Sequence, residues 1–271
     1  MNAVLSADGK RLAIADNQGL KIRALDSGRE KQLLPFDKYG RPVSWSPDAK
    51  FIYYLHPGEK PWIHDLWRVA VNAGTTGLLI QHVSGRPALT PDGRSVAFTR
   101  EDAIMLSGVD GKNEKVVCSP CKAGWDLTWS PDGSQLLIPQ WTMLANKQVK
   151  SRLVLMDVKT GRTTELASLD GLVGISGVSW TSAGVLLAYS GRNDDASQIW
   201  HMSVPSGDRT QVTRDPTGYD QLIGATPDGL SVVAVRQIPP LGYWQRAIAL
   251  FFGKEPGVDG PHGTVMLHLR K

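Results

Sequence analysis

The sequence has little of what several common protein classes require. Its two cysteines, Cys118 and Cys121, form one pair, and without a second pair or suitably spaced histidines they make no zinc site. No apolar run approaches the ~20 residues that a membrane helix needs. The first residues, MNAVLSADGK, lack the charged and apolar regions of a signal peptide. We therefore expect a chain that neither spans a membrane nor shows an export signal, while a mature or excised piece of a longer protein stays open.

Charge and catalytic motifs are equally sparse. Thirty Lys and Arg against 26 Asp and Glu leave a net charge of +4, which is dispersed and argues against nucleic-acid binding. The six histidines show no metal-ligand spacing, and no Gly-rich phosphate loop occurs. The segment from Gly174 resembles a nucleophile elbow until Val178, where glycine is required. The sequence predicts no catalytic residue, no metal site and no cofactor.

A repeated tetrad, Ser/Thr-Pro-Asp-Gly, organises the chain. Its third position falls at residues 8, 48, 92, 132, 183 and 228, which gives six units of 40 to 51 residues. Proline sets φ, aspartate can hydrogen-bond local backbone, and glycine accepts the left-handed conformation that closes a tight hairpin. The copies are SADG (6–9), SPDA (46–49), TPDG (90–93), SPDG (130–133), the degenerate TSAG (181–184) and TPDG (226–229).

Apolar, β-branched runs flank each tetrad, and no long window shows helical periodicity. A second turn, ending in glycine, follows about 20 residues after a tetrad and after a third strand, as at Gly28 and Gly74. Four antiparallel strands repeated six times predict an all-β, six-bladed β-propeller. The expected blades are about 1–39, 40–84, 85–124, 125–174, 175–219 and 220–271.

The repeat core WSPDG, its flanking strands and the downstream glycine turn resemble the WD40-like, PD40 repeats of the TolB-like propeller family. That family is related to the propellers of prolyl oligopeptidases and dipeptidyl peptidases. The resemblance covers roughly residues 1–237. It implies a six-bladed propeller that acts mainly by binding proteins, often in the bacterial periplasm or another extracytoplasmic compartment.

Long, irregular connections mark one side of the predicted blades. The tetrads and glycine turns share one end of the strands, so the B–C and D–A connections share the other, and function concentrates on such loops. The B–C loops are 56–65, 140–151 and 190–197, and the D–A loops include 81–86, 118–126 and 213–221. Because Trp, Tyr and Arg dominate binding hot spots, and because Asp126 and Asp220 begin inner strands, the candidate partner-binding residues are Trp62, His64, Arg86, Trp125, Asp126, Trp141, Arg192, Tyr219 and Asp220.

Other features have structural readings. Trp45, Trp129 and Trp180 stand two positions before the proline slot and are expected in the core between blades. Cys118 and Cys121 close a loop as a disulfide or remain two reduced thiols. In the last blade, 247–252 and 264–269 are expected as the third and fourth strands; alternatively, 238–263 is an insertion and the outer strand is missing, which exposes a sheet edge.

The sequence favours a monomeric protein-interaction module that binds a protein or peptide partner on the long-loop face and channel mouth. One rival is a propeller enzyme, such as a lactonase or a glycan-active hydrolase or lyase. Another is the sensory domain of a longer membrane-bound regulator.

Overall fold

The computed structural model contains only strands among its regular elements, within the residues that it describes. None of these residues forms a helix that is long and apolar enough to cross a membrane. The chain divides into two compact units, Met1–Ile138 with Met156–Thr163, and Pro139–Leu155 with Thr164–Lys271. The described residues are 2–16, 18–35, 40–121, 123–124, 126–143, 149–170, 174–181, 184–190, 197–214, 219–225, 231–237, 246–249 and 265–268.

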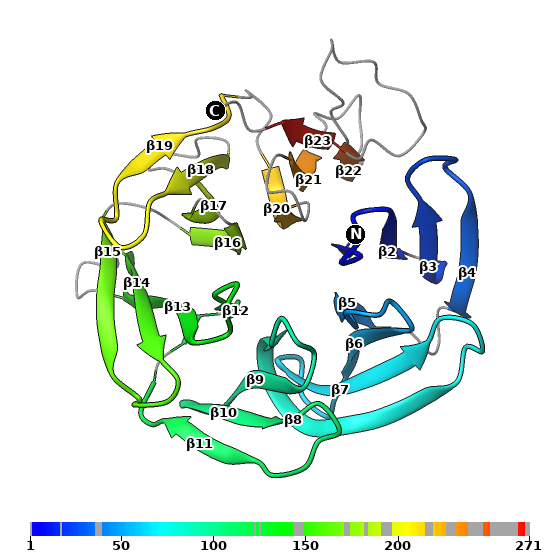
Figure 1. The fold of residues 1–271 in the computed structure, drawn as a ribbon, viewed down its shortest axis with the longest axis horizontal. Coiled ribbons are helices and arrows are strands. Elements are labelled where there is room, and N and C mark those ends of the chain that lie inside the picture. Colours follow the sequence, from blue (N-terminus) through cyan, green and yellow to red (C-terminus); the bar gives the residue numbers. More distant parts are fainter. Residues whose placement is uncertain are drawn as a thin grey trace. The chain divides into compact units, whose positions relative to one another are not determined.

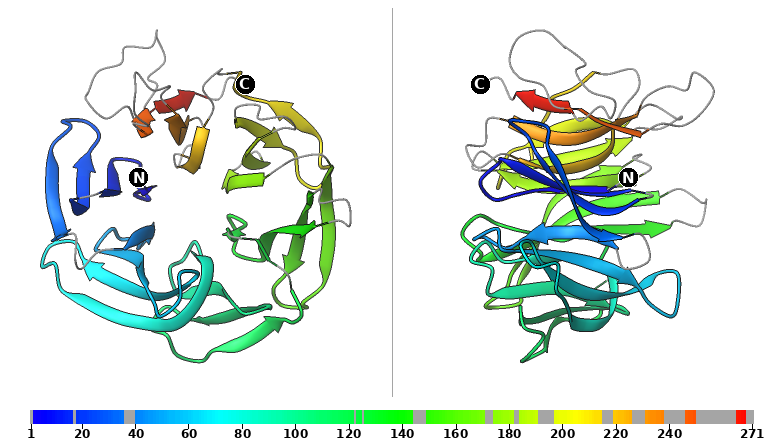
Figure 2. Two further views of the ribbon diagram at one scale, coloured as in Figure 1. Left: turned by 180° about the vertical axis from the view of Figure 1, so that it is seen from behind. Right: turned by 90° about the vertical axis from the view of Figure 1, so that its right-hand side faces the viewer.

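The first unit begins with a four-stranded antiparallel sheet in the order β1-β2-β3-β4, followed by a seven-stranded sheet in the order β11-β10-β9-β8-β7-β6-β5. Because the strands are antiparallel, successive connections alternate between the two ends of a sheet (Figure 2). The strands are β1 (Asn2–Leu5), β2 (Arg11–Asp16), β3 (Gly19–Ala24), β4 (Glu30–Pro35), β5 (Arg41–Trp45), β6 (Phe51–Pro57), β7 (Ile63–Ala70), β8 (Thr76–Leu89), β9 (Ser95–Arg100), β10 (Ala103–Gly108) and β11 (Lys115–Cys118).

The long strand β8 belongs to two groups of four strands (Figure 1). Its residues 76–84 pair with β7, whereas Ser84, Ala88 and Leu89 pair with β9. The prediction of an irregular loop at 81–86 was therefore wrong, because the chain passes from an outer to an inner position without leaving the sheet. Positive φ at His82 (57°) and Gly85 (70°) bends the strand there.

Three further sheets contain four strands each. Their orders are β12-β13-β14-β15, β16-β17-β18-β19, and β20-β21-β22 with β23 also paired to β21. The strands are β12 (Thr128–Trp129), β13 (Gln135–Met143), β14 (Val149–Asp157), β15 (Thr163–Asp170), β16 (Gly174–Thr181), β17 (Gly184–Ser190), β18 (Gln198–Met202), β19 (Arg209–Gln211), β20 (Tyr219–Ala225), β21 (Ser231–Gln237), β22 (Arg246–Ala249) and β23 (Val265–His268).

The last sheet differs from the expected order. β22 pairs with residues 234–237 of β21, and β23 pairs with residues 231–233 of the same strand. β20 occupies the opposite edge of β21, so β22 and β23 share one edge end to end. β23 is thus not an outer strand paired with β22, because β22 is too short to use the whole edge. Residues 246–249 thus pair with β21 and overlap the segment expected as the third strand, and among the described residues no outer strand pairs here, as in the alternative with a missing outer strand.

Four of the tetrads form the predicted turns with the same hydrogen-bond network, and the copy at 226–229 lies outside the described residues. In SPDG (130–133) the Ser130 hydroxyl donates to Asp132 Oδ1 at 2.6 Å, and the Ser134 amide donates to the same oxygen at 3.1 Å. The Gln135 amide donates to Ser130 Oγ at 2.9 Å. Equivalent hydroxyl-to-carboxylate bonds join Ser6 to Asp8, Ser46 to Asp48, and Thr90 to Asp92. At the degenerate copy, whose residues 182 and 183 lie outside the described residues, the Thr181 hydroxyl donates to the Gly184 carbonyl.

We expect Asp132→Asn to change how stability depends on acid. Hydrogen bonds from Ser130 and then Ser134 lower the pKa of the Asp132 carboxyl to about 2. Because the folded pKa lies below the unfolded value of ~3.9, the stability that this carboxylate contributes is present above pH ~4 and is lost as the pH falls towards 2. Urea unfolding from pH 6 to pH 2 should show the variant and the parent chain converging on acidification. Parallel curves would contradict the assignment.

Repeated tryptophans fill the space between successive sheets. Trp45 is 4% exposed, and its indole Nε1 donates to the carbonyl of Val4 at 3.1 Å. Two repeats later, Trp129 is 6% exposed and donates in the same way to Ala88 at 2.9 Å. Trp180 on β16 is only half-buried. The core role is confirmed for the first two tryptophans.

Candidate partner-binding site

The connection between β6 and β7 is a short loop that exposes Trp62. β6 ends at Pro57 and β7 begins at Ile63, so the irregular part is 58–62. The Gly58 amide donates to the Ile63 carbonyl at 2.9 Å, and the Ile63 amide donates to Lys60 at 3.0 Å. These bonds define the loop while the Trp62 side chain remains 61% exposed. The structure thus places Trp62 on the surface at the long-loop end of the strands.

His64 does not share this surface. It lies in β7 and is 6% exposed, because the alternation of the strand turns His64 and Leu66 inward. Burial is the main cause that lowers the pKa of the His64 imidazole, and the positive charge of Arg41 adds to it. His64 therefore has to be removed from the predicted contact surface.

Arg86 and Asp126 meet where two inner strands begin. Their backbones form an isolated parallel bridge, and the Arg86 guanidinium donates to the Val43 carbonyl at 3.2 Å. Both side chains are half-buried. Burial raises the pKa of the Asp126 carboxyl, and the nearby Arg86 opposes this shift. The structure thus brings two of the predicted residues together, and Trp125 beside them lies outside the described residues.

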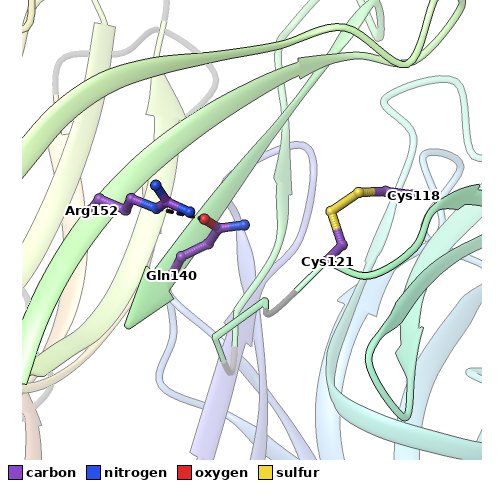
Figure 3. The surroundings of a disulfide bond; sticks show 4 residues. All are labelled: Cys118, Cys121, Gln140 and Arg152. Carbon is purple, nitrogen blue, oxygen red and sulfur yellow. Dashed lines mark hydrogen bonds between the residues drawn. A yellow bond between two sulfur atoms is a disulfide. The ribbon is translucent and has the colours of Figure 1, made fainter. Parts of the chain in front are cut away.

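Trp141, another predicted contact residue, belongs to the second unit and lies near the end of β13. Its side chain is 56% exposed. The neighbouring Gln140 is buried, and its side-chain oxygen accepts a hydrogen bond from Arg152 Nε on β14 at 2.8 Å (Figure 3). This bond anchors the strand from which Trp141 projects. Arg192 lies outside the described residues, as do the side chains of Tyr219 and Asp220 on β20.

A groove in the first unit was missed by sequence reasoning. It has a volume of about 810 Å³ and is lined by Glu59, Lys60, Ile63, residues 78–82 of β8, Arg100, Glu101 and Glu114. Its lining comes from four separate segments of the chain, so no local pattern could have indicated it. The exposed Leu78, in a run that the repeat assigns to an outer strand, was the one available signal.

Arg100 forms a rigid wall of this groove. Its guanidinium pairs with the Glu114 carboxylate, with nitrogen-to-oxygen distances of 2.6 and 3.2 Å. The same group donates to the carbonyls of Gln81 at 2.9 Å and His82 at 3.4 Å. It also stacks over Phe98 at 5.1 Å from the ring centre. A guanidinium with this many partners positions the wall and has little capacity left for a ligand.

Cys118 and Cys121 form a disulfide, with Cα atoms 5.6 Å apart (Figure 3). This is the loop-closing alternative of the two that the sequence left open. The Cys121 amide also donates to the Asp102 carbonyl at 2.6 Å, which ties the connection to the turn after β9. The described residues include no group of three or more His, Cys, Asp or Glu that could hold a metal ion.

The chain resembles known proteins both in sequence and in structure. No family model matches the chain. An uncharacterized protein of Agrobacterium fabrum is 25% identical over 200 residues, which are 68% of this chain and 67% of that protein.

Solved structures resemble the fold over most of its length. A putative TolB from Agrobacterium tumefaciens has a TM-score of 0.65 at 15% identity, covering 84% of this chain and 86% of that one. A chain from a nidogen/laminin complex has a TM-score of 0.63 at 16% identity, covering 84% and 86%. An oligogalacturonate lyase in complex with manganese has a TM-score of 0.61 at 19% identity, covering 87% and 73%. The predicted all-β, TolB-like propeller fold is confirmed; at such identities the likeness carries no function.

Proposed function

We propose that the protein is a six-bladed propeller that binds a protein or peptide partner through the long-loop ends of its strands. One observation carries the proposal: the loop 58–62 holds Trp62 exposed at 61%, and Glu59 and Lys60 of the same loop line a groove of about 810 Å³. The tetrad turns at the other ends of the strands are instead occupied with their own hydrogen bonds, as at Ser130 and Asp132. The long-loop side therefore has the residues that are not used by the fold.

Two comparisons support the proposal. The nidogen/laminin structure is a complex between proteins, and the likeness to TolB points to the same class of propeller.

The Cys118–Cys121 disulfide agrees with an oxidising, extracytoplasmic compartment such as the periplasm. We propose a monomer in that compartment, with blades divided near residues 40, 85, 125, 175 and 220.

Trp62→Ala is expected to weaken partner binding by about 2 kcal/mol or more, which is about 30-fold in Kd. The reason is that an exposed indole contributes large contact area and makes no repeat contact. The partner should first be captured with the full chain as bait, identified by mass spectrometry and purified. Calorimetric titration of that partner against both forms of the chain then gives the change in Kd.

Asp132→Ala is the matched control, because it removes a turn acceptor on the other side of the strands. It should lower the melting temperature and leave the partner affinity of the folded fraction unchanged. The proposal would be contradicted if Trp62→Ala spared binding and reduced stability as much as Asp132→Ala does.

An enzyme that uses the Arg86–Asp126 pair is the second candidate. The half-buried Asp126 carboxyl with its raised pKa is suited to proton transfer, and the oligogalacturonate lyase shows that a similar fold carries catalysis. Turnover of a glycan or lactone by the parent chain, lost in Asp126→Asn with the melting temperature unchanged, would favour the enzyme. If the parent chain turns over none of the glycans and lactones tested, the enzyme is contradicted and the binding function is favoured.

A further inference from the structure

The outer part of β8 provides the floor of the groove. On one edge, residues 76–84 pair with β7. On the other edge, pairing with β9 starts only at Ser84, so among the described residues no strand covers 76–83 there. The groove opens over this part of β8, between the loop 58–62 and the turn at Arg100 and Glu101, where the Arg100 guanidinium bonds to the carbonyls of Gln81 and His82. Its volume of about 810 Å³ is in the range of binding clefts and would admit several side chains of an extended peptide.

The floor is apolar. Leu78 is 44% exposed, and Ile63 and Leu79 beside it are half-buried. A single exposed leucine is ordinary on a protein surface. Here it lies in a concave site that Ile63 also lines, so an apolar group seated on Leu78 would lose part of its contact with water.

The rim is acidic once its internal pairing is considered. Three lining residues are glutamates (59, 101 and 114) and two are Lys60 and Arg100. Arg100 and Glu114 neutralise each other. Neither Glu59 nor Glu101 forms an ion pair with another residue that the structure describes. Lys60 offsets one of these two charges, so the rim keeps one net negative charge, which favours a positively charged group over an anionic one.

The backbone holds the acidic rim in place. Glu101 has φ of 56°, in the left-handed region, at the tight turn between β9 and β10. Ala103, two residues further on, pairs with Arg100, so Glu101 and Asp102 form the tip of a tight hairpin. The backbone position of Glu101 is thus fixed by the hairpin at the edge of the groove.

We infer that this groove binds an extended segment of the partner in which an apolar side chain covers Leu78 and a neighbouring Lys or Arg faces Glu59 and Glu101. The inference rests on the proposed function and names the chemistry of the partner. Alternating side chains of an extended peptide suit this surface, because apolar and basic positions then meet the floor and the rim in turn.

The probe is a short fluorescein-labelled peptide of alternating leucine and lysine, titrated with the full chain and followed by fluorescence anisotropy. A peptide with glutamate in place of lysine is the matched ligand. We expect saturable binding of the lysine peptide and no binding of the glutamate peptide. Combined Glu59→Gln and Glu101→Gln should weaken binding about fivefold, and Leu78→Ser about tenfold.

Asp26→Asn, an exposed substitution outside the groove, is the matched control and should bind like the parent chain. Equal affinity in the parent, the groove variants and this control would overturn the inference, as would preference for the glutamate peptide. Melting temperatures should be unchanged in all variants because the side chains are exposed.

The two proposals can fail separately. If the purified partner binds with an affinity that depends on Trp62 while neither peptide binds and the groove variants change nothing, the groove inference is wrong and the proposed function stands. If the lysine peptide binds through Glu101 and Leu78 but no protein partner depends on the long-loop side, the proposed function fails while the chemistry of the groove is supported.

Discussion

Trp45→Ala is expected to lower the free energy of unfolding by about 3 to 5 kcal/mol. The side chain lies in a cluster of buried residues that joins the first sheet to strands β5–β7 and that also contains Val4, Leu20 and Tyr54. Truncation would remove the indole, leave a cavity, and leave the Val4 carbonyl without the donor that it has now. The Arg11 guanidinium, 5.0 Å from the ring centre, would lose its stacking surface. Urea titration followed by circular dichroism measures the effect.

The chain offers a control of the same chemistry. Trp62→Ala removes an identical side chain from a position that is 61% exposed, and its effect on unfolding should stay within about 0.5 kcal/mol. If both substitutions cost the same, Trp45 is not the inter-sheet anchor that its burial indicates. Trp45→Phe should fall between them, because it restores most of the volume without the N–H donor.

Gly111→Ala is expected to destabilise the chain by about 3 kcal/mol, the second largest effect. Gly111 closes the turn between β10 and β11 with φ of 79°, which costs an L residue about 1 to 2 kcal/mol. In addition, a Cβ there would collide with the backbone carbonyl oxygen of Leu79 on β8, which cannot move aside as a side chain could. Thermal unfolding and urea titration of the variant measure the loss.

Gly77→Ala is the matched control on β8 itself. A Cβ at this position meets no atom within 4 Å, and no positive φ is required. The substitution should leave stability unchanged or raise it by up to ~1 kcal/mol, since alanine loses less conformational entropy than glycine on folding. A cost at Gly77 equal to that at Gly111 would show that β8 resists any substitution and that the close approach is not the cause.

Much of the fold could be predicted because its signals are local. A tetrad turn is made by a hydroxyl, a carboxylate and two amides within six residues, so the letters of SPDG and its copies already contain the interaction. The glycine turns at Gly74 and Gly111 connect the third and fourth strands where the repeat indicated. The same repeat located Trp45 and Trp129, each bonded 41 residues back to the equivalent preceding strand.

The predictions of strands and loops were wrong where one segment of the chain pairs with two neighbouring strands. Residues 81–86 contain turn-like His82 and Gly85, but both edges of β8 find partners around Ser84, so the segment stays in the sheet. The ends of β21 accept two different strands because 246–249 is too short to use its whole edge. His64 was predicted to lie in a loop, but the pairing of β7 with β8 makes it part of strand β7.

By itself, the sequence determined the all-β class, the repeat, the turns and the inter-sheet tryptophans, because each depends on side chains within a few residues or on a strict period. Only the tertiary structure decided which edge each strand uses, that His64 is buried, and that Glu59, Leu78 and Glu101 line one groove. Those outcomes depend on hydrogen bonds and contacts between segments separated by tens of residues. The local composition of two segments is the same whether or not they meet in the fold. A local sequence pattern therefore cannot predict the contacts between them.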